Sequence, residues 1–562
     1  MNSVLIPLLG AIIYLIGMRF YARYIDRKVV GADGRKATPA KMYADGVDFM
    51  PTSKSILFGY QFKSIAGAAP VLGPIIAIKW GWLPGLIWIL LGTFFIGWVQ
   101  DYMSTMVSVR SDGKTFGGIS FTLISARART ILLAFIYLYL LLLASSFAYT
   151  VAKTMAEAPK IPLAVVMLAI GGVVVGFLIY RGGAPLTLVT LIGLAIFYGA
   201  LALNHFLPIT ASLKIWLIFT LVFSFFGSVL PIWSFVQPVN YLSFYIILIG
   251  MAGAVLGIFV GHPGLERSST TGFAAAGDGL PLWPMLFVTI ACGAVSGWHG
   301  VVCSTGTSRQ LESELDARPV AGGAMFLEMI LSLIALTIVA ITPKDVGGAP
   351  GKLFGDGLGR LFGYLHLPES FGQVYGPLMI VILAITLLHL VIRFMRIGTN
   401  ELLGRALPIM RVPAIGTLVA LLLTFLLAYT GTFNYIWVLF GSANQLMASL
   451  ALMIASIWLV SQRKNAVFTA VPMLFMYITT MAAIAVLSRQ LLSQAFSGLG
   501  PDGKDLATDK VVGNWVAGLI GVALFAAALI LAYDGWRAYV RYRSLQKNSS
   551  AGPANSGISS AL

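Results

Sequence analysis

Long apolar runs recur along the whole chain, separated by short segments rich in Gly, Pro and charged residues. A membrane-spanning helix needs about 20 consecutive apolar residues, and these runs approach or reach that length. The pattern predicts an all-α polytopic membrane protein with about 15 transmembrane helices. We expect them at residues 3–18, 55–78, 83–108, 131–151, 162–180, 185–206, 214–234, 240–261, 283–303, 320–342, 374–392, 412–431, 436–460, 467–490 and 512–533.

Composition and charge agree with a lipid environment. Hydrophobic residues make up 58% of the 562 and charged residues only 10%, which excludes a soluble multidomain protein. The net charge of +16 would suit a nucleic-acid binder, but basic residues of a membrane protein chiefly mark its cytoplasmic loops. Placing the basic segment 19–54 in the cytoplasm puts most of the 37 Lys and Arg residues on that side. We therefore expect an external N-terminus, a cytoplasmic C-terminus and no nucleic-acid partner.

Two predicted spans resemble each other. Residues 62–69 and 287–294 share the pattern F-x-[ST]-I-A-x-x-A, and both are followed by residues that interrupt helices. By the predicted topology the two spans cross in opposite directions, as in inverted-repeat transporters with discontinuous helices. The alternative is that the small residues only allow close helix packing. The candidate substrate-binding residues at these breaks are Gly67, Ala68, Pro70 and Gly73 in the first copy and Gly293, Ser296 and Gly297 in the second.

Three charged residues lie within predicted spans, where each needs a partner or a function. Lys63, just before the first break, suits an anionic substrate or ion coupling; the alternative is snorkelling to the interface. Glu328 is the first choice for a proton site, and a structural ion pair with Lys63 is its alternative. Asp101 is a weaker coupling candidate, because capping or pairing with a basic loop residue such as Arg110 is favoured over a role in transport.

Three uncharged or titratable polar residues complete the candidate site. His299 follows the second break and can bind a carboxylate or relay a proton; it can equally remain neutral on a backbone carbonyl. Asn444 and Gln445, in the middle of a later span, can bind substrate or hydrogen-bond across helices.

Other chemistries find no support. Cys292 and Cys303 are too far apart on a helix to form a disulfide, and the histidine spacing predicts no metal site. The segment 112–115 (DGKT) imitates a phosphate-binding loop, but Ser108 occupies the position of its first glycine. We expect no cofactor, and an enzyme is disfavoured because no nucleophile or metal arrangement is recognisable.

The chain resembles the carbon starvation (CstA) family of peptide and pyruvate transporters over most of its length. The resemblance is carried by residues 48–54 (DFMPTSK), 65–70 (IAGAAP), 81–84 (GWLP), 100–102 (QDY), 289–299 (TIACGAVSGWH), 440–441 (FG) and 444–446 (NQL). It implies a bacterial inner-membrane secondary carrier with a LeuT-like fold, importing short peptides or pyruvate during carbon starvation. The sequence departs from the family pattern at Val239-Asn240, where relatives tend to have Arg-Asp, and at Lys63 and His389.

These observations predict alternating-access transport of short peptides or pyruvate, with the proton as the expected coupling ion. A channel or nutrient sensor on the same scaffold and a sodium-coupled carrier of small carboxylates are the alternatives; the oligomeric state stays open. The expected regions are 1–54 (N-terminal helix and basic segment), 55–234 (first repeat region), 235–282 (connection), 283–460 (second repeat region), 461–547 (C-terminal helices) and 548–562 (disordered tail).

Overall fold

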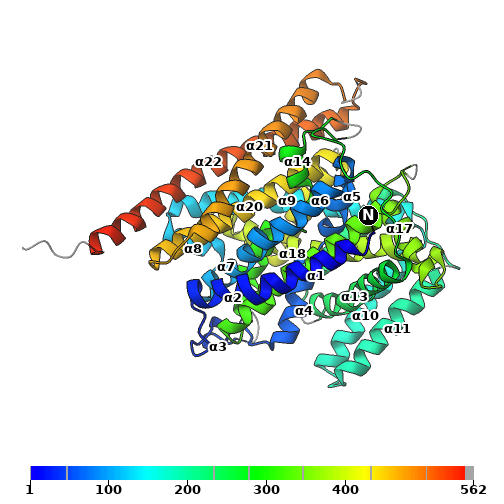
Figure 1. The fold of residues 1–562 in the computed structure, drawn as a ribbon, viewed down its shortest axis with the longest axis horizontal. Helices are drawn as coiled ribbons and strands as arrows, with labels where there is room; N and C mark the ends of the chain where they lie inside the picture. Colours follow the sequence, from blue (N-terminus) through cyan, green and yellow to red (C-terminus); the bar gives the residue numbers. More distant parts are fainter. Residues whose placement is uncertain are drawn as a thin grey trace, which may run out of the picture.

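The computed structural model of the chain is built from helices (Figure 1). The structure describes residues 2–45, 49–204, 206–231, 234–275, 279–344, 347–430, 433–500 and 503–550, and within these ranges β-pairing is limited to isolated bridges. The helices are α1 (Leu5–Ile16), α2 (Ala22–Tyr24), α3 (Pro39–Met42), α4 (Lys54–Ile65), α5 (Ala69–Ala77), α6 (Trp82–Gly92), α7 (Trp98–Val109), α8 (Phe116–Leu123), α9 (Ala126–Glu157), α10 (Pro162–Tyr180), α11 (Leu186–Asn204), α12 (Leu213–Val229), α13 (Val236–Gly261), α14 (Leu282–Thr289), α15 (Gly297–Thr305), α16 (Gly323–Ala340), α17 (Pro350–Tyr364), α18 (Glu369–Leu403), α19 (Pro413–Thr430), α20 (Phe433–Ser461), α21 (Val467–Ser497) and α22 (Thr508–Ser550).

The predicted spans all correspond to helical segments, with differences in length. Within the described residues, 11 helices are long and apolar enough to cross a membrane, or 12 if the bent pair α4 and α5 counts as one span. The remaining predicted spans correspond to the shorter apolar helices α12 and α19 and to the interrupted pair α14 and α15. A multi-pass all-helical membrane protein is confirmed, whereas the number of about 15 spans stays a prediction.

Two boundaries differ from the sequence prediction. The first helix does not end near residue 18 but continues through π-helical turns to Val30, so the first basic residues lie on helix rather than in a loop. The amphipathic helix α17 was not predicted as an element, because its apolar residues alternate with Gly and charged residues. The predicted tail 548–562 lies outside the described residues from 551 onward.

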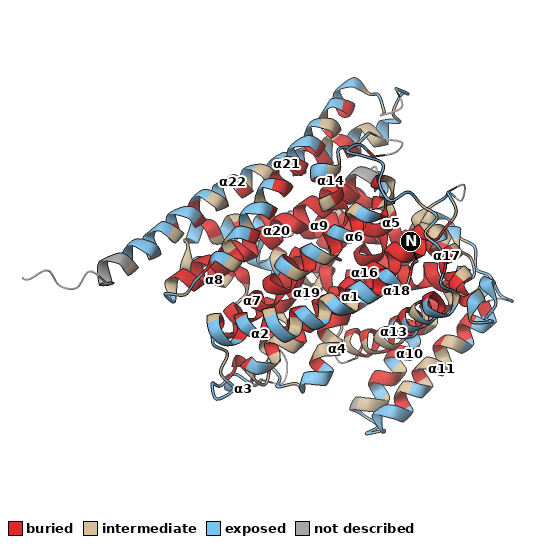
Figure 2. Cartoon of the chain, in the orientation of Figure 1, coloured by how far each residue is buried: buried red, intermediate tan, exposed pale blue. Residues whose placement is uncertain are grey.

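Burial separates a central group of helices from peripheral ones. The most apolar stretch of α20 is 100% buried, and those containing α16 and α18 are each 89% buried, whereas that of α22 is only 33% buried. Figure 2 shows the buried residues concentrated in the middle of the molecule, with exposed apolar faces on α1, α11 and α22. In a bilayer such outer faces contact lipid, so the peripheral helices enclose a central group that is shielded from it.

The two interrupted helices run antiparallel to each other through this centre. At one end, the Thr52 N–H just before α4 donates to the carbonyl of Gln310 (3.0 Å), shortly after α15. At the other end, Trp80 Nε1 after α5 donates to the carbonyl of Leu280 (3.0 Å), just before α14. The start of one broken helix therefore lies beside the end of the other, which is the relative direction that the sequence predicted.

Candidate functional site

The first break lies slightly earlier in the chain than predicted. Residues 66–68 leave the helical path between α4 and α5, and the two helices are bent by 45°. Pro70 occupies the first turn of α5, where a missing N–H costs nothing, so it starts a helix rather than interrupting one. Gly73 is helical as well; its role is close approach, because a Cβ there would lie 2.9 Å from the carbonyl oxygen of Thr289. The predicted break, which extended over Pro70 and Gly73, is corrected to residues 66–68.

The second break is longer, and its beginning lies against α5, the helix that follows the first break. Between α14 and α15, residues 290–296 form no regular helix, and Gly297 begins α15. The α5 backbone packs directly on the end of α14 through Gly73. The two breaks are therefore neighbours in the protein interior, and both are buried.

Side chains from neighbouring helices satisfy the unwound backbone. Carbonyl groups without helical partners are costly at bilayer depth and are tolerated only where protein or a cavity replaces the missing bonds. The donors are Trp298 Nε1 to Ser64 (2.7 Å), Ser332 Oγ to Pro70 (2.8 Å), Thr93 Oγ1 to Gly293 (3.1 Å), Trp88 Nε1 to Ile290 (3.1 Å) and the Gln100 amide, oriented to satisfy its neighbours, to Ser296 (2.9 Å). The breaks are specific features that several helices support.

Asn444 holds the second break from α20. Its Oδ1 accepts from the Trp298 N–H (3.0 Å), at the start of α15, and from the Tyr139 hydroxyl (2.9 Å). Its Nδ2 donates to Ser296 Oγ (3.1 Å). Gln445 donates to the carbonyl of Phe287 (2.9 Å), near the end of α14. Both amides thus make interhelical bonds to the broken helix.

His299 on α15 lies between two carboxylates, an arrangement that sequence reasoning did not assemble. Its Nδ1 lies 3.0 Å from Asp101 Oδ2 on α7, and its Nε2 lies 3.0 Å from Glu328 Oε2 on α16. All three side chains have no exposed surface. We call Asp101, His299 and Glu328 the buried triad. It corrects two alternatives: His299 faces carboxylates instead of a backbone carbonyl, and Asp101 does not pair with Arg110, which binds Glu314 (2.8 Å).

Glu328 is the least satisfied member of the triad. Its contact with His299 is close but poorly aligned for a hydrogen bond, and neither carboxylate oxygen has a hydrogen-bond partner among the described residues. Asp101, by contrast, also receives a bond from Gln100 to its other oxygen (2.9 Å). Leaving a buried carboxylate with so few donors is costly, which sets Glu328 apart from the other polar residues of this interior.

Lys63 lies in the same interior and does not snorkel. Its side chain is only 1% exposed, and its Nζ donates to Thr386 Oγ1 on α18 (2.6 Å). It interacts electrostatically with Glu328, although no direct ion pair forms between them. The alternative of a structural Lys63–Glu328 pair is therefore replaced by a lysine held on α18.

One set of possible metal ligands lies in this region. Donor atoms of Cys292, His299 and Glu328 lie within 4.8 Å of one another, a grouping that the histidine spacing along the sequence did not predict. The Cys292 sulfur also accepts a hydrogen bond from Asn444 (3.4 Å) and contacts Ser296 Oγ (3.3 Å). The geometry is that of an imidazole between two acids.

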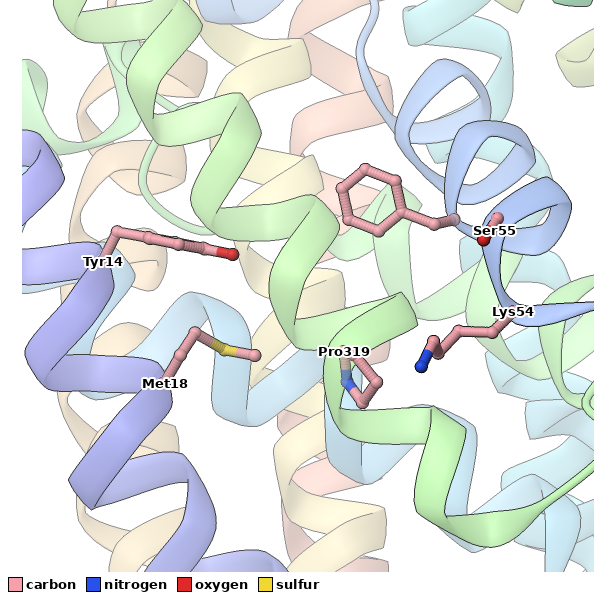
Figure 3. A pocket seen from close by; sticks show the side chains of 6 residues that line it. Tyr14, Met18, Lys54, Ser55 and Pro319 are labelled. Carbon is pink, nitrogen blue, oxygen red and sulfur yellow. The ribbon is translucent and has the colours of Figure 1, made fainter.

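A surface cavity of about 310 Å³ lies apart from the triad. It opens between α1, the N-terminal end of α4 and the turn before α16, and Figure 3 shows the Lys54 side chain reaching toward Pro319. Its other lining residues are Tyr14, Met18, Ser55 and Phe58. None of them belongs to the triad or to the breaks.

Several supporting residues escaped the sequence prediction. Gln100, Ser332 and Thr386 are ordinary polar residues within apolar spans, and only the tertiary contacts give them significance. The predicted span 374–392 places His389 near its end, but α18 continues to Leu403 and His389 is completely buried. The polar residues that follow Leu390 hid the true length of this helix from the apolar pattern.

An all-helical chain with a buried polar centre and two interrupted antiparallel helices defines a multi-pass membrane protein with an internal site. Comparison with protein families identifies which one. The family of the carbon starvation protein CstA matches residues 2–347 and 346–483, and the chain belongs to this family. Its relatives are named as transporters and not as enzymes.

Three relatives illustrate the similarity. The peptide transporter CstA of Mycobacterium tuberculosis is 34% identical over 365 residues, covering 61% of this chain and 47% of the relative. The pyruvate/proton symporter BtsT of Escherichia coli is 34% identical over 350 residues, covering 58% and 48%. The peptide transporter CstA of Bacillus subtilis is 28% identical over 546 residues, covering 85% and 89%. The chain thus spans about half the length of the first two relatives and most of the third.

Solved structures match this chain only with a low TM-score and a low sequence identity. A manganese transporter of Eremococcus coleocola matches with a TM-score of 0.43 and 12% identity, covering 86% of this chain and 95% of that one.

Proposed function

We propose that this protein is a secondary active transporter that imports a small carboxylate or short peptide across the bacterial inner membrane by alternating access. The observation that carries the proposal is the buried triad beside two neighbouring, antiparallel broken helices. Such breaks place helix ends at the centre of a bundle, which is how inverted-repeat carriers build a substrate site. The proposal includes LeuT-like inverted repeats and an external N-terminus.

The names of the relatives support this class of substrate. They are described as peptide transporters and as a pyruvate/proton symporter. We extend transport of a small organic molecule to this chain, in which the substrate lies between the breaks near residues 66–68 and 290–296. Lys63 would face its negative charge, and the breaks would supply backbone groups.

Charge balance supports a proton as the coupling ion. Asp101 and Glu328 can carry two negative charges, and Lys63 and His299 two positive ones, so the empty site has no net charge when all four are ionised. A buried region tolerates little net charge, because burying an uncompensated charge is costly. A bound monoanion would add one negative charge, which a proton on Glu328 cancels. Anion and proton would then move together.

The test is uptake into proteoliposomes with an imposed proton gradient. Wild-type protein is expected to accumulate pyruvate or a dipeptide above its external concentration, whereas Glu328→Gln and Lys63→Ala lose at least nine-tenths of this accumulation, in the range of removing an essential group. Glu401→Gln, on a partly exposed glutamate beside Arg129, is the matched control and keeps wild-type uptake. Passive equilibration by the wild type would instead favour a channel. Uptake that requires a sodium gradient would mean that sodium, and not the proton, is the coupling ion.

A further inference from the structure

Two buried polar side chains outside the triad, His389 and Asn240, have no hydrogen-bond partners among the described residues. His389 on α18 is fully buried, and neither ring nitrogen has a hydrogen-bond partner among the described residues. Asn240 on α13 is 4% exposed, and both its amide atoms are likewise unpartnered within the described part of the chain. Four buried polar atoms without partners are expensive, which is why such groups usually face a ligand or water.

The helix α18, which carries His389, runs along the first break. A Cβ on Gly67 would lie 2.7 Å from the Leu387 side chain, so this stretch of α18 touches the unwound residues directly. The hydroxyl oxygen of Thr386, next to Leu387, accepts a hydrogen bond from Lys63 Nζ (2.6 Å). His389 follows one helical turn later and shares the Thr386 face of α18. It also interacts electrostatically with Lys63.

The helix α13 brings Asn240 to the same region. Phe235, at its start, lies 6.2 Å from the His389 ring between centroids, and Phe244 lies 5.8 Å from the ring of Phe62. Asn240 lies between these two contacts, and it shares the Phe244 face of the helix because four residues separate them. Its amide is therefore carried on the face of α13 that meets α4.

Aromatic rings close this region and limit what it can hold. Phe62, Phe223 and Phe235 are almost completely buried, and Phe223 stacks on the His389 ring (6.0 Å between centroids). A ligand enclosed by these rings must be small. An ammonium recognises a carboxylate, and the imidazole and amide can each bond a second oxygen on the neighbouring carbon. The Thr386 hydroxyl positions the ammonium, because it accepts from Lys63 and donates to the carbonyl of Ile382.

We propose that Lys63, Thr386, Asn240 and His389 form the substrate subsite of this transporter, and that its ligand is a small monocarboxylate with an oxo or hydroxyl oxygen on the adjacent carbon. The inference rests on the proposed function for the ligand's role as substrate. It goes further by naming the binding groups and by choosing a small oxygenated acid over a peptide. Lys63, held in place by Thr386, binds the carboxylate, and Asn240 and His389 distinguish the adjacent oxygen.

The test is ligand-induced thermal stabilisation of the purified full chain with pyruvate, lactate, propionate and dialanine. Wild-type protein is expected to respond to pyruvate and lactate at concentrations at least tenfold lower than to propionate, which lacks the adjacent oxygen, and not to dialanine. Asn240→Leu and His389→Leu should abolish the preference for pyruvate over propionate. Thr386→Val should weaken all three acids alike. His262→Asn changes an exposed histidine with positive φ and is the matched control.

A stability readout separates a binding role from a structural one. Because Asn240 has unpartnered amide atoms, Asn240→Leu should raise the unfolding temperature of the ligand-free protein while removing its response to pyruvate. If Asn240→Leu and His389→Leu instead lower that temperature and keep the wild-type ligand preference, the subsite is wrong, and a preference for dialanine would also overturn it. This binding assay needs no transport, so uphill peptide uptake with no acid binding refutes the subsite alone. Passive flux with intact acid binding refutes only the proposed mechanism of transport.

Discussion

At the scale of single residues, the interior of this protein is organised by a few polar side chains that serve either backbone or chemistry. Asn444 serves backbone: its oxygen is shared by the Trp298 N–H and the Tyr139 hydroxyl, and its nitrogen binds Ser296. Glu328 is its opposite, a buried carboxylate whose oxygens have no hydrogen bond from any described residue. A residue with every bond satisfied supports the structure, whereas one left unsatisfied is suited to binding something that comes and goes.

Replacing Asn444 should therefore destabilise the second break. Asn444→Leu keeps the volume but leaves the Trp298 N–H and the Tyr139 hydroxyl buried without an acceptor, at about 1–3 kcal/mol for each. We expect a clear fall in the unfolding temperature of the detergent-solubilised protein. Gln445→Leu is the control, because Trp88 also donates to the Phe287 and Ile290 carbonyls that Gln445 serves. Equal losses for Asn444→Leu and Gln445→Leu would contradict this role for Asn444.

At the scale of elements, the sequence predicted the membrane-spanning helices, which depend on the length of apolar runs. It did not predict features that depend on tertiary contacts, such as the exact position of the first break and the buried triad. The spans were recognisable because lipid demands long apolar runs, and the similar segments at 62–69 and 287–294 correctly identified the two broken helices. The first break was misplaced because Pro70 and Gly73 read as helix breakers, although one starts α5 and the other packs on Thr289. The buried triad was not predicted as a unit, because its members come from three helices whose packing no local pattern encodes.

The close packing of α5 on the end of α14 makes a prediction about Gly73. Gly73→Ala would bring a Cβ to 2.9 Å from the Thr289 carbonyl, and since both partners are backbone the two helices must separate. We expect a loss of about 1–3 kcal/mol in stability, typical of overpacking, together with reduced uptake. Gly59→Ala, in α4 of the same broken pair, meets nothing within 4 Å and should be neutral or stabilising by up to about 1 kcal/mol. Thermal unfolding of both variants is the measurement. A Gly73→Ala protein as stable as Gly59→Ala would mean that α5 does not pack on the end of α14.

At the scale of the whole molecule, the antiparallel broken helices define two opposite faces. One face contains the start of α4 and the end of α15, joined between Thr52 and Gln310, and the Asp33 N–H extends it by donating to Glu314 (2.9 Å). The other contains the end of α5 and the start of α14, joined between Trp80 and Leu280. Ser268 belongs to this second face, because its carbonyl accepts the Trp82 N–H (3.2 Å).

The distribution of basic residues predicts which face is cytoplasmic. The segment 19–54 is strongly basic and lies on the first face, so that face should be the inner one. Ala37→Cys and Ser268→Cys introduce exposed thiols on opposite faces, while the native Cys292 and Cys303 are free but buried. In intact cells a membrane-impermeant maleimide should label Ser268→Cys and leave Ala37→Cys unlabelled until the membrane is permeabilised, and the unsubstituted chain should stay unlabelled throughout. Labelling of Ala37→Cys from outside would invert the orientation. The triad would then keep its geometry, but each face of the protein would meet the opposite compartment. The proposed import driven by an inward proton gradient would then have to begin at the face that contains the start of α4.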